Sequence, residues 1–318
     1  MQKTSIRPSS WRVTSSPHIR RPRTIASIML DVIIALLPAG AMGVYYFGYR
    51  AALLIVVSVA SSVAWEALIR KAMKKPVTIH DLSAVVTGIL LAYNLPVTIP
   101  LWAPVIATGI AIVIIKQLFG GLGQNFMNPA LAARAVLLAS WTSLMSSAAF
   151  TTDAVTSATP LVAQYGEYSL AQLFLGDVPG CIGETCKLAL LLGGIYLMAR
   201  RVISWRIPLT MIATVFVCFW IASGRVVGTV DSALYQILSG GLFLGAFFIA
   251  TDYATSPVTP VGRLVMGVGC GLLIFIIRRC NPSYPEGFSY AILVMNLATP
   301  LIDRFTRPRV YGEGRKHA

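Results

Sequence analysis

Long apolar stretches recur along almost the whole chain, and they limit the folds open to it. Hydrophobic residues make up 56% of the sequence, charged residues only 12%, and the mean hydropathy is +0.73. A helix needs roughly 17 to 25 mostly apolar residues to cross a bilayer, and the chain supplies about ten such stretches. The sequence therefore predicts an all-α integral membrane protein rather than a soluble domain. The predicted spans are Thr24–Phe47, Ala51–Ile69, Leu82–Pro100, Leu101–Phe119, Pro129–Ala149, the short Leu188–Met198, Ile207–Ser223, Leu234–Ala250, Leu264–Ile277 and Phe288–Ile302.

Basic residues gather at the ends of these spans and account for the net charge of +14. They precede the first span, follow the second and sixth, and close the chain. Positively charged loops remain cytoplasmic, so both termini are predicted in the cytoplasm, with the first span retained as an anchor. Residues 151–186 then fall on the outer face, where Arg278 and Arg279 also land and fit the scheme badly. Because topology explains the charge, no nucleic-acid partner is expected.

A small polar tract, Asp153-Ala-Val-Thr-Ser-Ala-Thr159, follows the fifth apolar stretch. It is similar to the pattern Asp-x-x-Ser/Thr-Ser/Gly-Ala-Thr, at which a transferase joins the phosphate of FMN to the last threonine of bacterial respiratory flavoproteins. Thr159 is that threonine here, and Asp153, Thr156, Ser157 and Ala158 complete the motif. A phosphoester at this hydroxyl leaves the isoalloxazine ring free for redox chemistry. The alternative is an ordinary polar loop, because so permissive a pattern recurs by chance.

A glycine-rich stretch with two amides, Gly120–Ala130, joins the fourth and fifth spans on the cytoplasmic side. It lacks the Gly-Lys-Ser/Thr ending of a phosphate-binding loop. Gly120 and Gly121 permit close approach of the backbone to a planar ligand, and Asn125 and Asn128 can bond the pyrimidine edge of a flavin. The structural alternative is a helix start with Asn128 as the cap before Pro129. Both interpretations can hold together.

Three acids within or beside the spans are candidates for an ion pathway, because a buried charge in a membrane is costly. Asp252 lies where the eighth span gives way to a Thr/Ser/Pro-rich break, a setting that suits Na⁺ or a proton. Asp31 lies inside the first span and needs a partner or water. Asp303 stands beside Arg304, so an interfacial ion pair is its alternative. Glu66 and Asp81 are expected at the membrane interface.

The five cysteines do not predict a metal site or an iron–sulfur cluster, because no Cys-x-x-Cys spacing occurs. Cys181 and Cys186 share the predicted outer segment, where a disulfide is physically possible in an oxidising compartment.

An internal repeat relates spans three to five to spans eight to ten. Thr87–Thr98 and Leu244–Pro260 are both apolar helices followed by Pro- and Thr-rich breaks, and Met127-Asn128 is echoed by Met295-Asn296. Halves of about five helices each would have opposite orientation, and such inverted repeats with broken helices usually build a site at the midplane. The alternative is chance similarity among membrane helices, which share few residue types.

Several of these motifs, in this order, closely resemble the D subunits of Rnf complexes, which are membrane-bound ferredoxin:NAD⁺ oxidoreductases. The chain resembles the B subunits of Na⁺-translocating NADH:quinone reductases less closely. The similarity runs nearly end to end, with Ser157 where relatives often have Gly and Cys181 and Cys186 where they often have Ser. It is carried by Asp81–Gly88, Gly120–Ala130, Asp153–Leu161, Leu173–Gly176, Pro179–Thr185, Phe247–Asp252 and Asn296–Asp303.

The resemblance implies covalent FMN on Thr159, a second, non-covalent flavin such as riboflavin among the helices, and coupling of electron flow to Na⁺ or H⁺ export. It also implies a bacterial plasma (inner) membrane and partner subunits, including a second covalent flavoprotein and iron–sulfur subunits. The expected organisation is a basic cytoplasmic segment (1–23), a first membrane repeat (24–150), a flavin-bearing outer loop (151–186), a second repeat (187–303) and a basic tail (304–318). The alternatives are a flavin-independent secondary transporter or channel, and a membrane scaffold.

Overall fold

The computed structural model describes residues 24–145, 151–152, 155–156, 160–161, 168–223, 229–280 and 286–307. Almost all of this part of the chain is helical, which confirms the predicted class. The elements are α1 (Ile25–Phe47), α2 (Tyr49–Ala72), η1 (Ile79–Asp81), α3 (Ser83–Tyr93), α4 (Trp102–Gly109), η2 (Ile110–Gln117), α5 (Pro129–Ser140), α6 (Thr142–Met145), β1 (Thr151–Thr152), β2 (Val155–Thr156), α7 (Leu170–Leu175), α8 (Lys187–Ala199), α9 (Arg206–Ala222), α10 (Thr229–Leu238), α11 (Leu242–Leu244), η4 (Gly245–Ile249), α12 (Pro260–Cys280) and α13 (Phe288–Thr306).

Three of the described helices, α1, α2 and α12, are long and apolar enough to cross a membrane by themselves. A fourth candidate is the pair formed by α10 and the α11–η4 segment, which is bent by 68°. The other apolar helices are shorter, and α4 continues directly into the π-helix η2. The protein is therefore a membrane protein with several apolar helices, and the count of about ten spans remains a prediction.

Helix ends follow local residue chemistry. Thr24 caps α1 by accepting the Ser27 N–H at 3.2 Å, and Asn128 caps α5 by accepting the N–H groups of Ala130 and Leu131. Pro129 occupies the first position of α5, where a missing N–H costs nothing. The predicted cap at Asn128 is thus confirmed.

Two predicted spans are interrupted. The third, Leu82–Pro100, was predicted to be broken by Pro and Thr, and α3 has only 11 residues and ends at Tyr93, before Pro96. The eighth, Leu234–Ala250, bends between α10 and α11, where Gly240 has a φ of +66°. Glycine adopts this left-handed backbone without strain, so the chain turns there rather than only at the Thr/Ser/Pro-rich stretch after Asp252.

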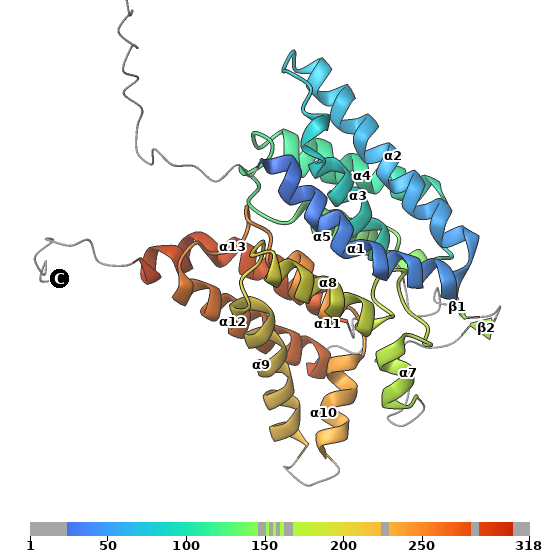
Figure 1. The fold of residues 1–318 in the computed structure, drawn as a ribbon, viewed down its shortest axis with the longest axis vertical. Coiled ribbons are helices and arrows are strands. Elements are labelled where there is room, and N and C mark those ends of the chain that lie inside the picture. The colour runs from blue at the N-terminus through green and yellow to red at the C-terminus, as the bar shows by residue number, and fades with distance from the viewer. Residues whose placement is uncertain are drawn as a thin grey trace, which may run out of the picture.

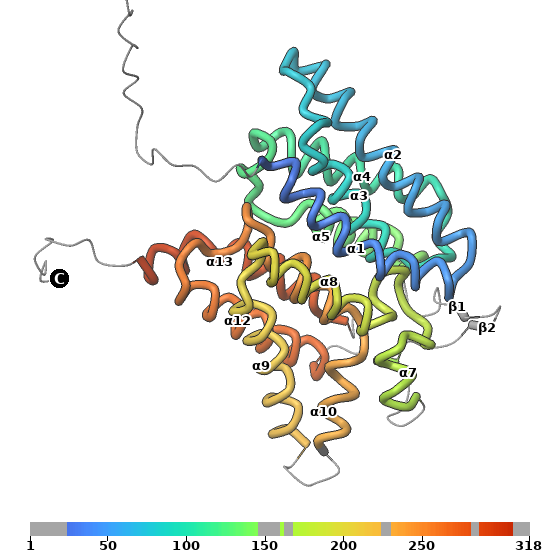
Figure 2. Tube along the Cα trace, in the orientation of Figure 1, coloured from blue at the N-terminus to red at the C-terminus, as the bar shows by residue number. Residues whose placement is uncertain are grey.

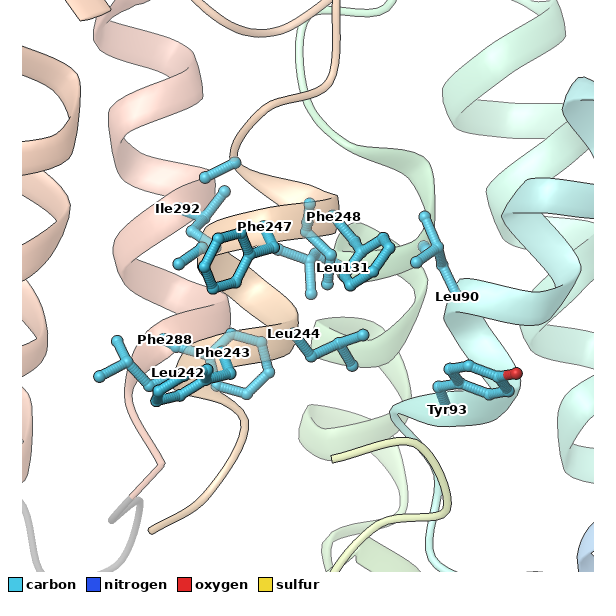
Figure 3. Packing of buried hydrophobic residues seen from close by; sticks show 14 of the residues in the cluster. Leu90, Tyr93, Leu131, Leu242, Phe243, Leu244, Phe247, Phe248, Phe288 and Ile292 are labelled. Atoms are coloured by element: carbon cyan, nitrogen blue, oxygen red, sulfur yellow. The ribbon is translucent and has the colours of Figure 1, made fainter. Parts of the chain in front are cut away.

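The helices form two groups that meet along α1 and α8 (Figure 1). Helices α1 to α5 gather in one group and α9 to α13 in the other, as the tube in Figure 2 also shows. The groups join where α1 packs on α8 and α5 packs on α13. Side chains of the two broken segments approach each other here: Leu90 of α3 faces Phe248 of η4, with Leu131 of α5 beside them (Figure 3).

The outer surface carries many large apolar side chains. On α12, Leu264, Val268, Leu272 and Ile276 recur every fourth residue and are all at least 36% exposed. A stripe of this kind would be buried in a water-soluble protein, and in a membrane it faces lipid or neighbouring subunits.

Candidate functional site

A cavity lies at the meeting of the two helix groups, and it is the principal candidate site. It encloses about 80 Å³ and is lined by α1, α3, η2, the segment before α5 and the end of η4. Asn125, Asn128 and Asp252 all line this cavity. The sequence had predicted the two asparagines as flavin ligands and Asp252 as part of an ion pathway. Its other polar lining residues include Ser83, Thr87, Lys116, Thr251 and Tyr253.

The two predicted amides differ in what they offer to a ligand. Asn128 uses its side-chain oxygen for the helix cap, so its amide nitrogen is the group left to donate. Asn125 is only 7% exposed, and its Oδ1 accepts no hydrogen bond from the described residues. A buried acceptor without a donor is costly, so this atom suits a ligand that brings an N–H group.

The glycines of the same stretch shape the turn and do not line the cavity. Gly120, Gly121 and Gly123 have φ values of +121°, +95° and +90°, a backbone that glycine tolerates best. The Gly121 N–H bonds the carbonyl of Lys116 at 2.9 Å and ends η2. These glycines form the turn after η2 that places Asn125 in the lining of the cavity.

A buried ion pair borders the cavity, and the sequence reasoning missed it. The Lys116 ammonium lies 2.9 Å from Glu66 Oε2 and donates to Ser83 Oγ at 2.6 Å. Glu66 is fully buried, and Gln117 and Thr78 also donate to its carboxylate. Its expected place at the membrane interface stays a prediction. Lys116 could have indicated this pair from the sequence, because it is a lone charge in the apolar run Ile110–Gln117 and needs a buried partner.

Asp252 stands where the central cavity meets a second one of about 580 Å³. Both cavities are lined by Ile28, Met29, Leu122, Asp252 and Tyr253, so they adjoin each other. Thr255 and the backbone N–H groups of Tyr253 and Ala254 donate to the Asp252 carboxylate. Burial outweighs these bonds and raises the pKa of Asp252 above its usual value.

The two other predicted acids have defined partners. Asp303 lines the second cavity and accepts the Val258 N–H at 3.1 Å. Asp31 has the partner that the sequence demanded: it accepts from Tyr196 at 3.0 Å and pairs with Arg200 at 3.2 Å. That pair ties α1 to α8 and lies outside the lining of both cavities.

The attachment motif lies largely outside the described residues. Asp153, Ser157, Ala158 and Thr159 belong to that undescribed part. Thr156 falls in β2, where its backbone pairs with Thr151 of β1. The next described residue after the motif, Pro160, is buried and lines a small cavity beside Glu184 and Lys187.

Within the described residues, all five cysteines are free thiols, and Cys181 and Cys186 are buried. Ligand atoms of Cys181, Glu184 and Glu286 lie within 4.8 Å of one another. Glu184 was expected as a charge of the outer loop, but it is only 2% exposed. The sequence reasoning did not foresee this cluster, because its members come from distant segments.

Comparison with known proteins gives consistent results over nearly the whole chain. A model of the NQR2, RnfD, RnfE family matches residues 12–312. The chain is 54% identical to the D subunit of the Na(+)-translocating ferredoxin:NAD(+) oxidoreductase complex of Acetobacterium woodii, over 94% of this chain and 95% of that one. It is 40% identical to the D subunit of the proton-translocating ferredoxin:NAD(+) oxidoreductase complex of Clostridium ljungdahlii, over 99% and 100%. It is 37% identical to the D subunit of the ion-translocating oxidoreductase complex of Shewanella amazonensis, over 95% and 98%.

Proposed function

The chain belongs to the NQR2, RnfD, RnfE family and is a D subunit of an ion-translocating ferredoxin:NAD⁺ oxidoreductase complex, and from this premise we propose that it carries electrons through flavins and couples them to ion movement. The observation that carries the proposal is the match over residues 12–312, which covers both the attachment motif and the cavity-lining segments. Partner subunits, including a second covalent flavoprotein and iron–sulfur subunits, handle NAD⁺ and ferredoxin, since this sequence has no dinucleotide-binding or cluster-binding motif.

FMN is held covalently through its phosphate on Thr159. The motif Asp153–Thr159 supports this assignment, as does its position directly before the buried Pro160. When bound, the isoalloxazine ring supplies one- and two-electron redox chemistry that no amino-acid side chain offers. The predicted outer location of residues 151–186 would present this group to a neighbouring subunit.

The second, non-covalent flavin lies with the pyrimidine edge of its ring in the central cavity, whose volume of about 80 Å³ does not hold the whole group. Asn125 supports this placement because its buried Oδ1 lacks a donor, and the pyrimidine edge of a flavin carries an N–H group. Phe247 and Phe248 supply aromatic faces in the same lining. Lys116 adds a positive charge that favours an anionic ligand, although Glu66 compensates part of it.

The ion route runs from the second cavity to Asp252. Asp303 and Asp252 line that cavity together, and Asp252 alone of the two also borders the central cavity. A carboxylate with freed backbone groups at a helix break is a usual site for Na⁺ or a proton in transporters. The relatives' names include both a Na⁺-translocating and a proton-translocating complex, so both ions are candidates here.

The first test is the intact mass of the chain purified from a host that contains the flavin transferase. A mass increase equal to FMN, mapped to the peptide that contains Thr159, is expected. Thr159→Ala should lose the increase and stop electron transfer by the complex, while Thr151→Ala, just outside the motif, should keep both. An unmodified wild-type peptide, or full activity of Thr159→Ala, would contradict the proposal.

The rival function is flavin-independent transport, and the two adjoining cavities beside Asp252 favour it. A secondary transporter would need a route past Asp252 but not Thr159. A colourless, flavin-free protein that moves Na⁺ across proteoliposome membranes without an electron donor would establish this alternative.

A further inference from the structure

A second cluster of buried charges lies away from the central cavity. It consists of Arg134 on α5, Glu184 before α8, Lys187 on α8, Arg278 on α12 and Glu286 before α13. Arg134, Glu184 and Lys187 are each at most 3% exposed. Charges removed from water to this degree need partners, so their bonding pattern is informative.

Each cation of the cluster already has its own partners. Arg134 pairs with the Glu286 carboxylate and donates to the Ser289 hydroxyl. Lys187 donates to the backbone carbonyls of Glu184 and Thr185, the latter at 3.3 Å. Arg278, which fitted the predicted topology badly, donates to the carbonyls of Gln236 and Ser239 and so caps the broken end of α10.

Glu184 is left without a cation of its own. Its Oε1 accepts the Cys181 N–H at 3.1 Å, and no basic side chain among the described residues reaches its carboxylate within 4.0 Å. Its Oε2 and the Oε1 of Glu286 are both buried, and neither accepts from an N–H or O–H donor among the described residues. Each glutamate therefore has one oxygen engaged and one oxygen unsatisfied.

Oxygen atoms of the two carboxyl groups lie within 4.8 Å of each other. Ionised carboxylates only accept hydrogen bonds, so the two groups can bond each other only when one of them carries a proton. That single proton would satisfy both orphaned oxygens and remove the repulsion of two like charges. We propose that Glu184 and Glu286 form a proton-binding site, in which Glu184 carries the proton and donates it to the Glu286 carboxylate.

A metal ion is a poorer occupant than a proton. Cys181 Sγ and the two carboxyl groups lie close enough to ligate one. However, the Arg134 guanidinium occupies the same space, since it contacts Glu286 and lies 4.0 Å from Cys181 Sγ. Three fixed cations surround two carboxyl groups, so a further cation would be repelled, whereas a proton binds in place on an oxygen.

The charges of the cluster shift the pKa values of the two glutamates in opposite directions. Burial, and then the charge of Glu286, raise the pKa of Glu184 to about 7. Burial also acts to raise the pKa of Glu286, but Arg134 outweighs it and lowers that pKa below its usual value. Burial and the neighbouring glutamates raise the pKa of the Cys181 thiol, so it stays protonated. Glu184 is thus the group that exchanges the proton near neutral pH.

The pair lies beside the segment that follows the attachment motif. Glu184, Lys187 and Glu286 line the small cavity that Pro160 and Gly240 also border, and Asp252 does not line it. The site is argued from its own contacts and does not depend on the presence of a flavin.

Infrared spectroscopy of the purified complex tests the site directly, because a protonated carboxyl absorbs apart from carboxylates and amides. The carbonyl band of a protonated glutamate is expected at pH 5, with loss of the band as the pH rises through about 7. ¹³C-labelled glutamate should shift the band in the wild type. Glu184→Gln should remove it, whereas Glu66→Gln combined with Lys116→Met, which removes a second buried glutamate together with its counter-charge, should leave it in place.

A second variant keeps the proposal testable if Glu184→Gln fails to fold. Glu286→Gln removes the neighbouring negative charge and frees Arg134, so the midpoint of the Glu184 band should move to lower pH by about one unit or more. Any of three results would overturn the proposal. The wild type could show no such band from pH 5 to 9, or its band could fail to shift with ¹³C-glutamate. Alternatively, the band could be unchanged in both Glu184→Gln and Glu286→Gln.

Discussion

At the scale of single residues, the interior of this membrane protein depends on a few charges with assigned partners. Lys116 and Glu66 illustrate this, since both are almost fully buried and each provides the other's only counter-charge among the described residues. Separating such a pair leaves one uncompensated charge in a low-dielectric interior, which costs far more than the pair itself contributes.

Replacing Lys116 with Met should therefore destabilise the folded chain by about 3 to 5 kcal/mol. Thermal unfolding of the purified protein in detergent measures the effect, and Lys74→Met, at an exposed position, is the control. The double variant with Glu66→Gln should recover most of the loss, because the orphaned carboxylate is gone. Equal midpoints for Lys116→Met and Lys74→Met would show that the pair is not needed.

Asn125 allows a sharper test of the second flavin. Asn125→Leu removes the buried acceptor, so acid-extractable flavin in the purified complex should fall at least tenfold, the loss expected when a ligand N–H is left unpaired. Covalent flavin fluorescence should be unchanged. The control is the neighbouring Gln124→Leu, whose side chain is exposed and does not line the cavity. Retention of extractable flavin in Asn125→Leu would place that flavin elsewhere.

The buried glutamate pair also predicts how stability changes with pH. Folding raises the pKa of Glu184 from 4.5 to about 7, so the native state holds a proton that the unfolded state releases. The contribution of Glu184 to the free energy of unfolding is complete below about pH 4.5 and is lost as the pH rises through about 7. The unfolding midpoints of wild type and Glu184→Gln should therefore be compared from pH 5 to 8. As the pH rises, the wild type should lose the stability that the protonated Glu184 contributes, whereas Glu184→Gln should not.

At the scale of elements, the loop before α8 is fastened to the end of the broken helix α3. The Gly183 N–H bonds the Tyr93 carbonyl at 3.1 Å, and the Ile182 N–H bonds the Leu95 carbonyl at 3.3 Å. A Cβ added at Gly183 would overlap the Tyr93 ring. The loop thus fills the place where α3 stops, and it can do so only with glycine at this position.

Gly183→Ala should accordingly lower stability by about 1 to 3 kcal/mol through overpacking. Gly180→Ala, in the same loop, is the matched control, because its Cβ would meet only the Thr185 methyl at 3.2 Å and the Glu184 side chain. Detergent thermal melts should separate the two variants. A Gly183→Ala protein as stable as Gly180→Ala would contradict the fastening role.

The sequence allowed helix starts and the break after α3 to be predicted, but not the bend between α10 and α11 or the long-range pairs. The start of α5 followed from Asn128 and Pro129, because a cap and a first-turn proline are local signals. The break after α3 followed from Pro96 in the same way, whereas its contact with the loop before α8 depends on residues far along the chain. The partnership of Lys116 with Glu66 was equally invisible, since spacing alone does not show which faces meet.

At the scale of the whole molecule, the described residues form two helix groups (Figure 1). A cavity lies between the groups, and a cluster of charged residues lies at another junction. The inverted-repeat relation and the placement of both termini in the cytoplasm remain predictions. Cys280, at the exposed end of α12, can test the topology, because the predicted spans place it on the outer face.

A membrane-impermeant maleimide should label Cys280 in intact cells, and Cys280→Ser should abolish that labelling, since the other described cysteines are buried or half-buried. In the Cys280→Ser background, Ser15→Cys in the basic N-terminal segment should react only after the membrane is permeabilised. The opposite orientation would give the reverse result. The cysteine of Ser15→Cys would then react in intact cells, and Cys280 of the wild type would react only after the membrane is permeabilised.

The bond between Gly183 and Tyr93 also bears on how the protein is made. Inside a bilayer no water can satisfy a free carbonyl, so the end of α3 needs a protein donor wherever it lies at membrane depth. That donor is synthesised long after α3 has left the ribosome. The first helix group therefore cannot reach its final arrangement during translation of its own residues, because the bond between Gly183 and Tyr93 forms only after the segment before α8 has been made.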